Sequence, residues 1–425
     1  MSYLLGAIAD DFTGATDLAA MLAREGMRVT VCVGVPREGL ELPPADAVVI
    51  ALKSRTAPVR EAVRDSLATL SWLQSRGCRQ FFFKYCSTFD STDFGNIGPV
   101  ADALLDALGA DFTVVCPAFP ENQRTVYKGY LFVGEVLLSE SSMRDHPLTP
   151  MRDANLVRVL GRQTPHKVGL AGYESVAMES LALWERLEAL RLEGCRYAVV
   201  DALSDLHLRT LGEACRGLPL ITGGSGAAMG LPRNFRLEGQ LRRGEGPAPM
   251  PKLGGGAAVL AGSCSAATLA QIAAMEKTRP SYPLDIPSLS QNPTSVLDGL
   301  LRWAEEHKSS GPVLVYSSAS PEEVRGYQET YGPGIAHRIE ETLATLAQKL
   351  AASGFDKLVV AGGETSGAVV RALGVQALSI GPEIAPGVPW TQALPQGNMA
   401  LALKSGNFGG PEFFLKAFEV LALDS

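Results

Sequence analysis

The sequence predicts an α/β protein of two domains, each with a mostly parallel sheet flanked by helices. Short apolar runs rich in β-branched residues recur along the chain, as in strands that a parallel sheet buries on both faces. Longer stretches with apolar residues at helical spacing separate these runs. A chain of 425 residues is longer than a single hydrophobic core usually accommodates, so two domains are expected.

The expected strands begin with the apolar run at 4–9. They continue at 47–54, 81–88, 112–119, 197–205 and 218–226, and then at 257–265, 312–320, 357–367 and 399–410. Helical spacing is clearest at 61–77, 180–194 and 338–354. This alternation of strands and helices is typical of parallel α/β folds.

The segment at 236–255 is rich in Gly, Pro and charge and has no apolar periodicity, which indicates a linker. We therefore expect a first domain at 1–235 and a second at 256–425. A second irregular region at 147–155 is expected to form a loop or lid.

Composition excludes several classes of function. The formal net charge of −7 and the pI near 5.4 argue against a nucleic-acid-binding protein. No apolar run approaches the roughly 20 residues that span a bilayer, and no signal peptide is recognisable. The seven scattered cysteines and five histidines lack metal-ligand spacing, so free buried thiols are expected. We expect a cytoplasmic enzyme, with a homodimer as the default assembly.

Ligands of open α/β sheets bind at the carboxyl ends of strands, near the point where the strand order reverses. In the second domain, small residues collect at three such ends: 262–268, 361–367 and 405–410. Their backbone N–H groups, with a helix start at the second turn, favour an anion such as a nucleotide phosphate. The alternative is that Gly and Ser only make tight turns. There is no P-loop and no GxGxxG after the first strand.

The first domain supplies charge at its strand ends. Four cations, Lys53, Arg55, Lys84 and Arg124, lie at or just after expected strands. Such a rim suits a carboxylate or a phosphate, although each cation alone would suit a solvated surface. Nearby polar residues are expected to contact hydroxyl groups of a ligand. They are Ser87, Thr88, Asp90, Ser91, Thr92 and Asn96.

Asp10 and Asp11 follow the first strand directly. In one interpretation, Asp11 or Thr13 caps a helix that begins near Gly14. In the other, one aspartate accepts a proton from an attacking hydroxyl. Two carboxylates this close repel each other unless a cation lies between them, and Lys84 or Mg²⁺ would serve. An active site in the cleft between the two domains is the simplest arrangement.

Seven motifs resemble the four-carbon acid sugar kinases from end to end. They are IADDFTGATD at 8–17, ALKSRT at 51–56, FFFKYCSTFDST at 81–92, CPAFPENQRTVYKG at 116–129, TGGSG at 222–226, AGGETSG at 361–367 and LKSGNFG at 403–409. Within that family, the forms at 83–92 and 146–160 are most similar to the 3-oxo-tetronate kinases. One departure is Gln123, where the family motif has Gly.

The resemblance implies ATP-dependent transfer of a phosphoryl group to the C4 hydroxyl of a 3-oxo four-carbon sugar acid, in four-carbon acid sugar catabolism. It also implies an N-terminal sugar-acid domain, a C-terminal nucleotide domain, and ATP and Mg²⁺ as cofactors. The implied ATP-contacting residues are Ser263, Gly362, Gly363, Glu364, Thr365 and Gly406. From the charged strand ends we expect the catalytic residues to be Asp10, Asp11 and Lys84. The expected substrate-binding residues are Lys53, Arg55, Ser87, Asp90 and Arg124.

Three alternatives stay open at this point. One is a kinase of the same family for threonate or erythronate. The second is a hydrolase or aldolase that uses the Lys84 amine as a nucleophile, and the third is a sugar-acid sensor without turnover. The sequence leaves open the ligands of the metal, the stereochemistry of the substrate, and which aspartate is the base.

Overall fold

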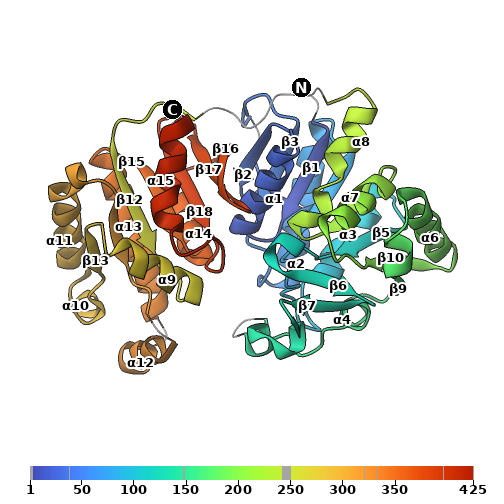
Figure 1. The fold of residues 1–425 in the computed structure, drawn as a ribbon, viewed down its shortest axis with the longest axis horizontal. Coiled ribbons are helices and arrows are strands. Elements are labelled where there is room, and N and C mark those ends of the chain that lie inside the picture. Colours follow the sequence, from blue (N-terminus) through green and yellow to red (C-terminus); the bar gives the residue numbers. More distant parts are fainter. Residues whose placement is uncertain are drawn as a thin grey trace. The chain divides into compact units, whose positions relative to one another are not determined.

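The computed structural model describes residues 3–37, 39–146, 149–241, 250–319, 321–332, 334–395 and 397–424. The chain divides into two compact units, Met1–Pro247 and Ala248–Ser425. Part of the expected linker (242–249) and part of the expected lid (147 and 148) lie outside the described residues. Each unit contains a mostly parallel sheet with helices packed on it, which confirms the predicted fold class (Figure 1). In the described part of the chain, no helix combines the length and apolarity that crossing a membrane requires.

The sheet of the first unit has eight parallel strands in the order β2-β3-β1-β4-β11-β5-β10-β9. They are β1 (Leu5–Ala9), β2 (Val29–Val33), β3 (Ala47–Ala51), β4 (Gln80–Lys84), β5 (Thr113–Cys116), β9 (Lys167–Ala171), β10 (Cys195–Val200) and β11 (Leu220–Gly223). The helices are α1 (Phe12–Arg24), α2 (Val59–Ser75), α3 (Ile97–Leu108), α4 (Leu156–Gln163), α5 (Tyr173–Val176), α6 (Ser180–Leu192), α7 (Asp205–Ala214) and α8 (Leu231–Leu237). After β1 the chain builds β2 and β3 on one side and then crosses to β4 on the other, so the strand order reverses between β1 and β4.

A small antiparallel sheet of β6 (Arg124–Tyr127), β7 (Tyr130–Val133) and β8 (Val136–Leu137) leaves the main sheet after β5. Short 3₁₀ turns flank it: η1 (Pro120–Asn122), η2 (Leu138–Glu140) and η3 (Ser142–Asp145). Asp201, at the end of β10, anchors this excursion because its buried carboxylate accepts the N–H groups of Lys128, Gly129 and Tyr173.

The glycines of the TGGSG motif allow the backbone at the end of β11 to pack closely against the backbone at the end of β5. A Cβ atom on Gly223, Gly224 or Gly226 would lie 2.3, 2.7 or 2.6 Å from the carbonyl oxygen of Cys116, Pro117 or Ala118, respectively. The turn η4 (Ser225–Ala228) therefore lies directly against the chain after β5. Ser225 is fully buried in it and donates to Asp17 of α1 at 2.6 Å.

The second unit has the strand order β13-β14-β12-β15-β18-β17-β16. The strands are β12 (Gly256–Ala261), β13 (Ser281–Pro283), β14 (Val313–Tyr316), β15 (Phe355–Ala361), β16 (Ala377–Ala385), β17 (Val388–Leu394) and β18 (Ala400–Lys404). Its helices are α9 (Ala266–Met275), α10 (Ile286–Gln291), α11 (Pro293–Glu306), α12 (Pro321–Tyr331), α13 (Ile335–Ala352), α14 (Gly363–Ala372) and α15 (Phe413–Asp424), with the 3₁₀ turn η5 (Lys308–Ser310). Here the order reverses between β12 and β15, because β13 and β14 lie on one side of β12 and β15 on the other.

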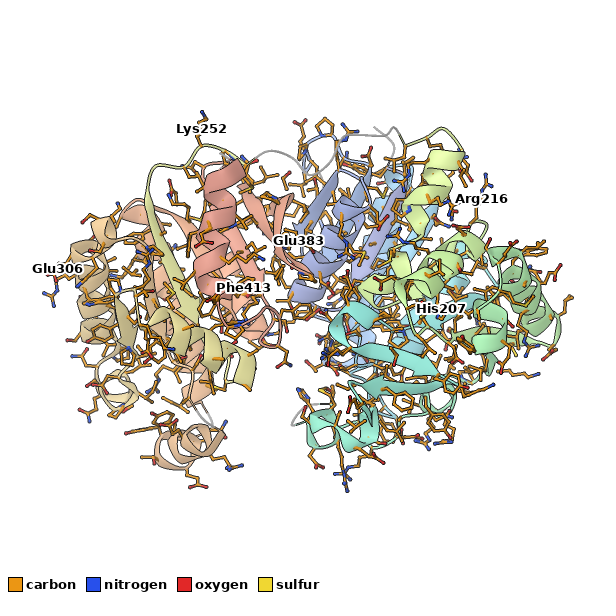
Figure 2. The ribbon with its side chains drawn as sticks, in the orientation of Figure 1. His207, Arg216, Lys252, Glu306, Glu383 and Phe413 are labelled. Atoms are coloured by element: carbon orange, nitrogen blue, oxygen red, sulfur yellow. The ribbon has the colours of Figure 1, made fainter. Side chains whose placement is uncertain are left out.

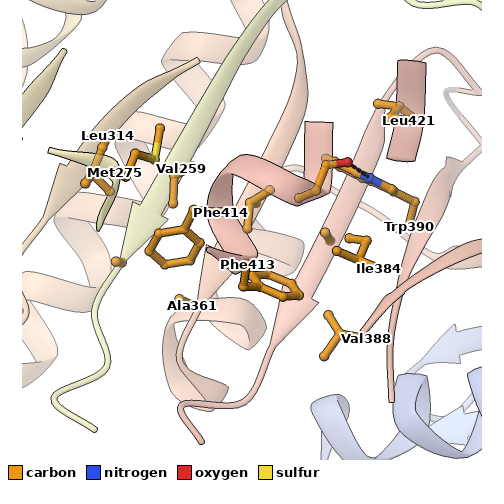
Figure 3. Packing of buried hydrophobic residues seen from close by; sticks show 14 of the residues in the cluster. Val259, Met275, Leu314, Ala361, Ile384, Val388, Trp390, Phe413, Phe414 and Leu421 are labelled. Atoms are coloured by element: carbon orange, nitrogen blue, oxygen red, sulfur yellow. Dashed lines mark hydrogen bonds between the residues drawn. The ribbon is translucent and has the colours of Figure 1, made fainter. Parts of the chain in front are cut away.

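Strands β16 and β17 form an antiparallel hairpin that the sequence analysis did not predict, and β17 pairs antiparallel with β18. The hairpin contributes Ile384, Val388 and Trp390 to a core that also contains Phe413 and Phe414 of α15 (Figure 3). Trp390 of β17 is fully buried there, and its indole N–H donates to the carbonyl of Ala417 at 2.7 Å. This contact fixes α15 against the sheet and places Phe413 near the end of β18.

Candidate active site

In the first unit, Asp10 and Asp11 lie where β1 ends and α1 begins, at the reversal of strand order. Arg55 donates to both oxygens of Asp10, at 2.9 Å from Nε and 2.8 Å from Nη2. The same Nη2 lies 3.0 Å from Oδ1 of Asp11. The cation between the two carboxylates is thus Arg55, where the sequence analysis had considered Lys84 or Mg²⁺.

Asp11 also caps the helix. Its Oδ1 accepts the Gly14 N–H at 2.9 Å and its Oδ2 accepts the Thr13 hydroxyl at 3.1 Å. The helix begins at Phe12, two residues earlier than expected. A Cβ atom on Gly14 would lie 2.3 Å from Asp11 Oδ1, so glycine allows the carboxylate to take this position.

The two aspartates have different electrostatic environments. Burial raises the pKa of Asp10, and the charge of Arg55 offsets only part of that effect. Burial also acts to raise the pKa of Asp11, but the charges of Arg55 and Lys84 and the hydrogen bond from Gly14 together lower it below its ordinary value. The Asp11 side chain is 27% exposed and that of Asp10 only 7%. Asp11 is therefore the more accessible carboxylate, and its surroundings favour the ionised form more strongly than those of Asp10.

Asp90 completes the surroundings of Arg55, with its Oδ2 3.8 Å from Nη1. The Thr88 hydroxyl donates to the other oxygen of Asp90. Asn96, expected to contact a hydroxyl, instead holds the Arg55 loop: its amide donates to the carbonyls of Ser54, Arg55 and Ala57 at 2.7, 3.3 and 2.9 Å. The position of the guanidinium is thereby fixed from the loop behind it.

Lys84 ends β4 and is 2% exposed. Its ammonium donates to the carbonyl of Tyr85 at 2.8 Å and lies 4.0 Å from Asp17 Oδ2. A buried, charge-paired amine is poorly placed to attack a carbonyl carbon, which disfavours the hydrolase or aldolase alternative. Its charge nevertheless acts on both aspartates.

The remaining predicted substrate-binding residues lie around this cluster in different settings. Ser87 is the second residue of a turn closed by the Phe89 N–H on the Cys86 carbonyl. Arg124, at the start of β6, is close enough to Asp90 to be influenced by its charge, and burial lowers the pKa of Arg124. Within the described residues Arg124 has no carboxylate at ion-pair distance, and its buried Nε has no hydrogen-bond partner. The Lys53 side chain is exposed.

The first unit also contains a cavity of about 660 Å³. The segment after Asp90, residues 91–94, forms one wall, and residues 150–154 of the expected lid form another. Arg158 and Arg162 of α4 also line it, each paired with Asp153. The described part of the predicted lid therefore borders a cavity whose opposite wall begins one residue after Asp90.

In the second unit, three strand ends meet at its reversal of strand order. Ser263 follows β12, Gly362 follows β15, and Gly406 lies two residues after β18. The Ser263 N–H donates to the carbonyl of Ala361 at 3.1 Å, and the Gly362 N–H donates to that of Lys404 at 2.8 Å. Backbone hydrogen bonds thus join the three turns into one rim.

The side chain of Thr365 leaves room only for glycine at two positions of this rim. A Cβ atom on Gly262 or Gly362 would lie 2.3 or 2.9 Å from its hydroxyl oxygen. Gly362 also has φ +128°, a conformation that only glycine adopts readily. The turn is consequently narrow and presents backbone groups instead of side chains.

The first turn of α14, which Gly362 precedes, provides the N–H groups of Gly363, Glu364 and Thr365. Helix geometry leaves these without intrahelical acceptors, and the helix dipole makes this end partly positive. Together with Ser263 and Ile339 of α13, they line a cavity of about 280 Å³. Tyr327, Ile335 and Ala336 add an apolar wall. The cavity combines donors for an anion with a surface for a flat apolar ring.

Lys404 belongs to this rim and was not among the predicted site residues. It is fully buried, and burial lowers its pKa to about 7. The signal was present in the sequence: a lysine ends the apolar run ALAL, directly before a Gly-containing turn.

No cluster of three or more His, Cys, Asp or Glu side chains able to hold a metal ion occurs among the described residues. Asp10 and Asp11 are occupied by Arg55. His207 on α7 accepts the Leu203 N–H through Nδ1 and packs against Tyr173 (Figure 2). All seven cysteines are free, with Cys86 and Cys264 only partly buried.

Comparison with known families identifies the class of this two-unit protein. Residues 5–231 match the family model of a sugar-binding N-terminal domain, and residues 258–414 match that of a nucleotide-binding C-terminal domain. The chain therefore belongs to this family, which confirms the resemblance to the four-carbon acid sugar kinases.

Relatives named 3-oxo-tetronate kinase match nearly the whole chain. Those from Burkholderia multivorans and Cupriavidus necator are each 57% identical, covering 98% of this chain and 97% of their own lengths. A solved structure from Salmonella typhimurium LT2, provisionally described as a tRNA synthase, is 45% identical with a TM-score of 0.89, over 97% of this chain and 98% of that chain. The chain is a kinase of this family.

Proposed function

We propose that this kinase transfers the γ-phosphoryl group of ATP to the C4 hydroxyl of 3-oxo-tetronate, giving the 4-phosphate and ADP. The observation that carries the proposal is the end-to-end similarity to the relatives named 3-oxo-tetronate kinase, at 57% identity. The proposal includes Mg²⁺ on the ATP phosphates, a role in four-carbon acid sugar catabolism, and a cytoplasmic homodimer.

Asp11 is the proposed general base. It would accept the C4 hydroxyl proton while the hydroxyl oxygen bonds to the γ-phosphorus and the bond to ADP breaks. Its 27% exposure supports this role, because a bound hydroxyl could reach it, and its lowered pKa keeps the carboxylate free of a proton. Asp10 is the counter-ion that holds Arg55 in place.

For the substrate carboxylate we propose Arg124, aided by Ser87 and by the exposed Lys53. Arg124 is the best-supported of these because it has no carboxylate at ion-pair distance among the described residues and its Nε is buried without a partner. Arg55 is already surrounded by Asp10, Asp11 and Asp90, so its proposed contribution is to organise them. Lys84 contributes positive charge from beneath the cluster.

For the nucleotide we propose the rim of the second unit. The phosphates would accept the N–H groups of Gly363, Glu364 and Thr365, with Ser263 and Gly406 beside them. Phosphoryl transfer depends on alignment and charge stabilisation more than on covalent chemistry, which suits a site of this kind.

A coupled assay of ATP consumption over four-carbon acids tests the proposal. We expect turnover with 3-oxo-tetronate and a kcat/KM at least about tenfold lower with threonate or erythronate. Activity confined to the two reduced acids would replace this substrate with theirs. If the acids stabilise the protein against unfolding but none of them leads to ADP formation, the result would support a sensor instead.

A further inference from the structure

Side chains on one face of α9 and at its N-cap hold the loop after β18 by donating hydrogen bonds to the carbonyl groups of that loop. Ser265 and Thr268 donate to the carbonyl of Gly406, at 2.6 and 3.0 Å. One turn further along α9, the amide of Gln271 donates to the carbonyls of Phe408, Gly409 and Gly410 at 3.0, 3.0 and 3.1 Å. Four carbonyls of the loop therefore point toward the interior.

Lys404 adds a cation to this interior. Its Nζ donates to the carbonyl of Ser405 at 3.0 Å, to that of Gly406 at 2.8 Å and to the Thr268 hydroxyl at 3.1 Å. From α15, the centroid of the Phe413 ring lies 5.9 Å from this ammonium. Among the described residues, no carboxylate lies within ion-pair distance, so a fully buried ammonium is balanced by neutral oxygens only.

The orientation of these carbonyls determines where the N–H groups point. In a planar trans peptide the C=O and N–H bonds point in opposite directions. Because the carbonyls of Ser405 and Gly406 face Lys404, the N–H groups of Gly406 and Asn407 face away from it. Neither N–H has a backbone acceptor in the described chain, whereas the Phe408 N–H closes the turn on Ser405 at 3.2 Å.

We propose that Lys404 is a positioning residue for the nucleotide: its ammonium orients two peptide groups so that the N–H groups of Gly406 and Asn407 bind phosphate oxygens, and its charge favours that anion. This inference rests on the proposed nucleotide site. The location agrees with it, since a Cβ atom on Gly406 would lie 2.3 Å from the Ser263 hydroxyl, which lines the nucleotide cavity.

A consequence is that nucleotide binding should take up a proton. Burial lowers the pKa of Lys404 to about 7, so the free protein loses part of this charge near neutral pH. A bound phosphate raises the pKa again, because an anion favours the protonated amine. The groups that face Lys404 from α9, α15 and the loop are Thr268, Phe413 and two carbonyls, none of which titrates in this range.

The first experiment uses the wild-type chain and ADP. Calorimetric titrations at pH 8, in two buffers of different ionisation enthalpy, should show net proton uptake on binding. The dissociation constant should rise roughly tenfold between pH 6.5 and 8.5, because the protonated form binds.

The second experiment compares Lys404→Met with Lys357→Met. Lys357 also donates to two carbonyls, those of Leu253 and Gly255, but it lies near the amino end of β15. We expect Lys404→Met to bind ADP at least about tenfold more weakly at pH 6.5. The dissociation constant of Lys404→Met for ADP should also change less between pH 6.5 and 8.5 than that of Lys357→Met, because the titrating amine of Lys404 is absent. Titration of the ADP phosphate itself is common to both variants and cancels in their ratio.

Melting curves from circular dichroism check that both variants fold. The measurement of proton uptake uses the wild-type chain, so it does not depend on the folding of either variant. Equal affinity and equal pH profiles for the two variants, or no proton uptake by the wild type, would overturn the role of Lys404 while leaving the kinase proposal intact. Absence of ADP binding by the wild type and by Lys357→Met would overturn the nucleotide site itself, and the inference with it.

Discussion

The two units have the same strand order around their reversal points, β2-β3-β1-β4 in one and β13-β14-β12-β15 in the other. Their rims nevertheless differ in chemistry. The first presents charged side chains, with one arginine held among carboxylates. The second presents backbone N–H groups from turns rich in Gly and Ser. Topology therefore decides where a site forms, and the residues at the strand ends decide what it binds.

Two cations, one from each rim, sharpen this difference. Arg55 is compensated by Asp10 and Asp11, whereas Lys404 is surrounded by neutral oxygens. The first arrangement is complete without a ligand and is suited to fixing side-chain geometry. The second leaves a positive charge that an anionic ligand would balance.

The largest expected effect is on turnover in the charged rim. Asp11→Asn should lower kcat by about 10²- to 10⁴-fold, because an amide accepts no proton, while the retained oxygen still caps α1. Asp10→Asn should lower kcat less and should chiefly destabilise the Arg55 loop. Steady-state kinetics with melting curves check both variants. A smaller loss of kcat in Asp11→Asn than in Asp10→Asn would assign the base to Asp10.

The next effect is on stability and contrasts the two cations. Arg55→Met removes the cation from two poorly exposed carboxylates and should lower the free energy of unfolding by about 3–5 kcal/mol. Lys404→Met leaves no uncompensated charge and should cost well under that amount. Urea denaturation of both variants measures the difference. Equal losses of unfolding free energy would mean that Arg55 and Lys404 stabilise the fold to the same extent.

The smallest effect concerns Gln123, where the family motif has glycine. Gln123 ends the turn η1 with φ +58°, in the left-handed region where L-residues other than glycine are strained. Gln123→Gly should therefore raise the free energy of unfolding by about 1 kcal/mol without changing kcat. Gln123→Ala, which keeps the strain, is the control and should give no gain in the urea midpoint.

Much of the fold followed from sequence patterns. Of the nine strand candidates after the first, each overlaps an observed strand, from β3 to β18, because parallel strands buried on both faces have continuous apolar runs. The hairpin of β16 and β17 was missed: its runs contain Gly381, Pro382 and Pro389, which interrupt the pattern. The small sheet from Arg124 to Leu137 was missed because its strands are short and only partly buried.

The sequence by itself determined which strand ends carry chemistry and which family the chain belongs to, because both are written in local motifs such as ADDFTG and AGGETSG. The tertiary structure alone decided how those groups are paired. It placed Arg55 between Asp10 and Asp11, committed Asn96 to a backbone loop, and buried Lys404 where none of the described carboxylates pairs with it. Such pairings join residues tens to more than a hundred positions apart, and spacing along the chain carries no information about which side chains meet at a common sheet edge.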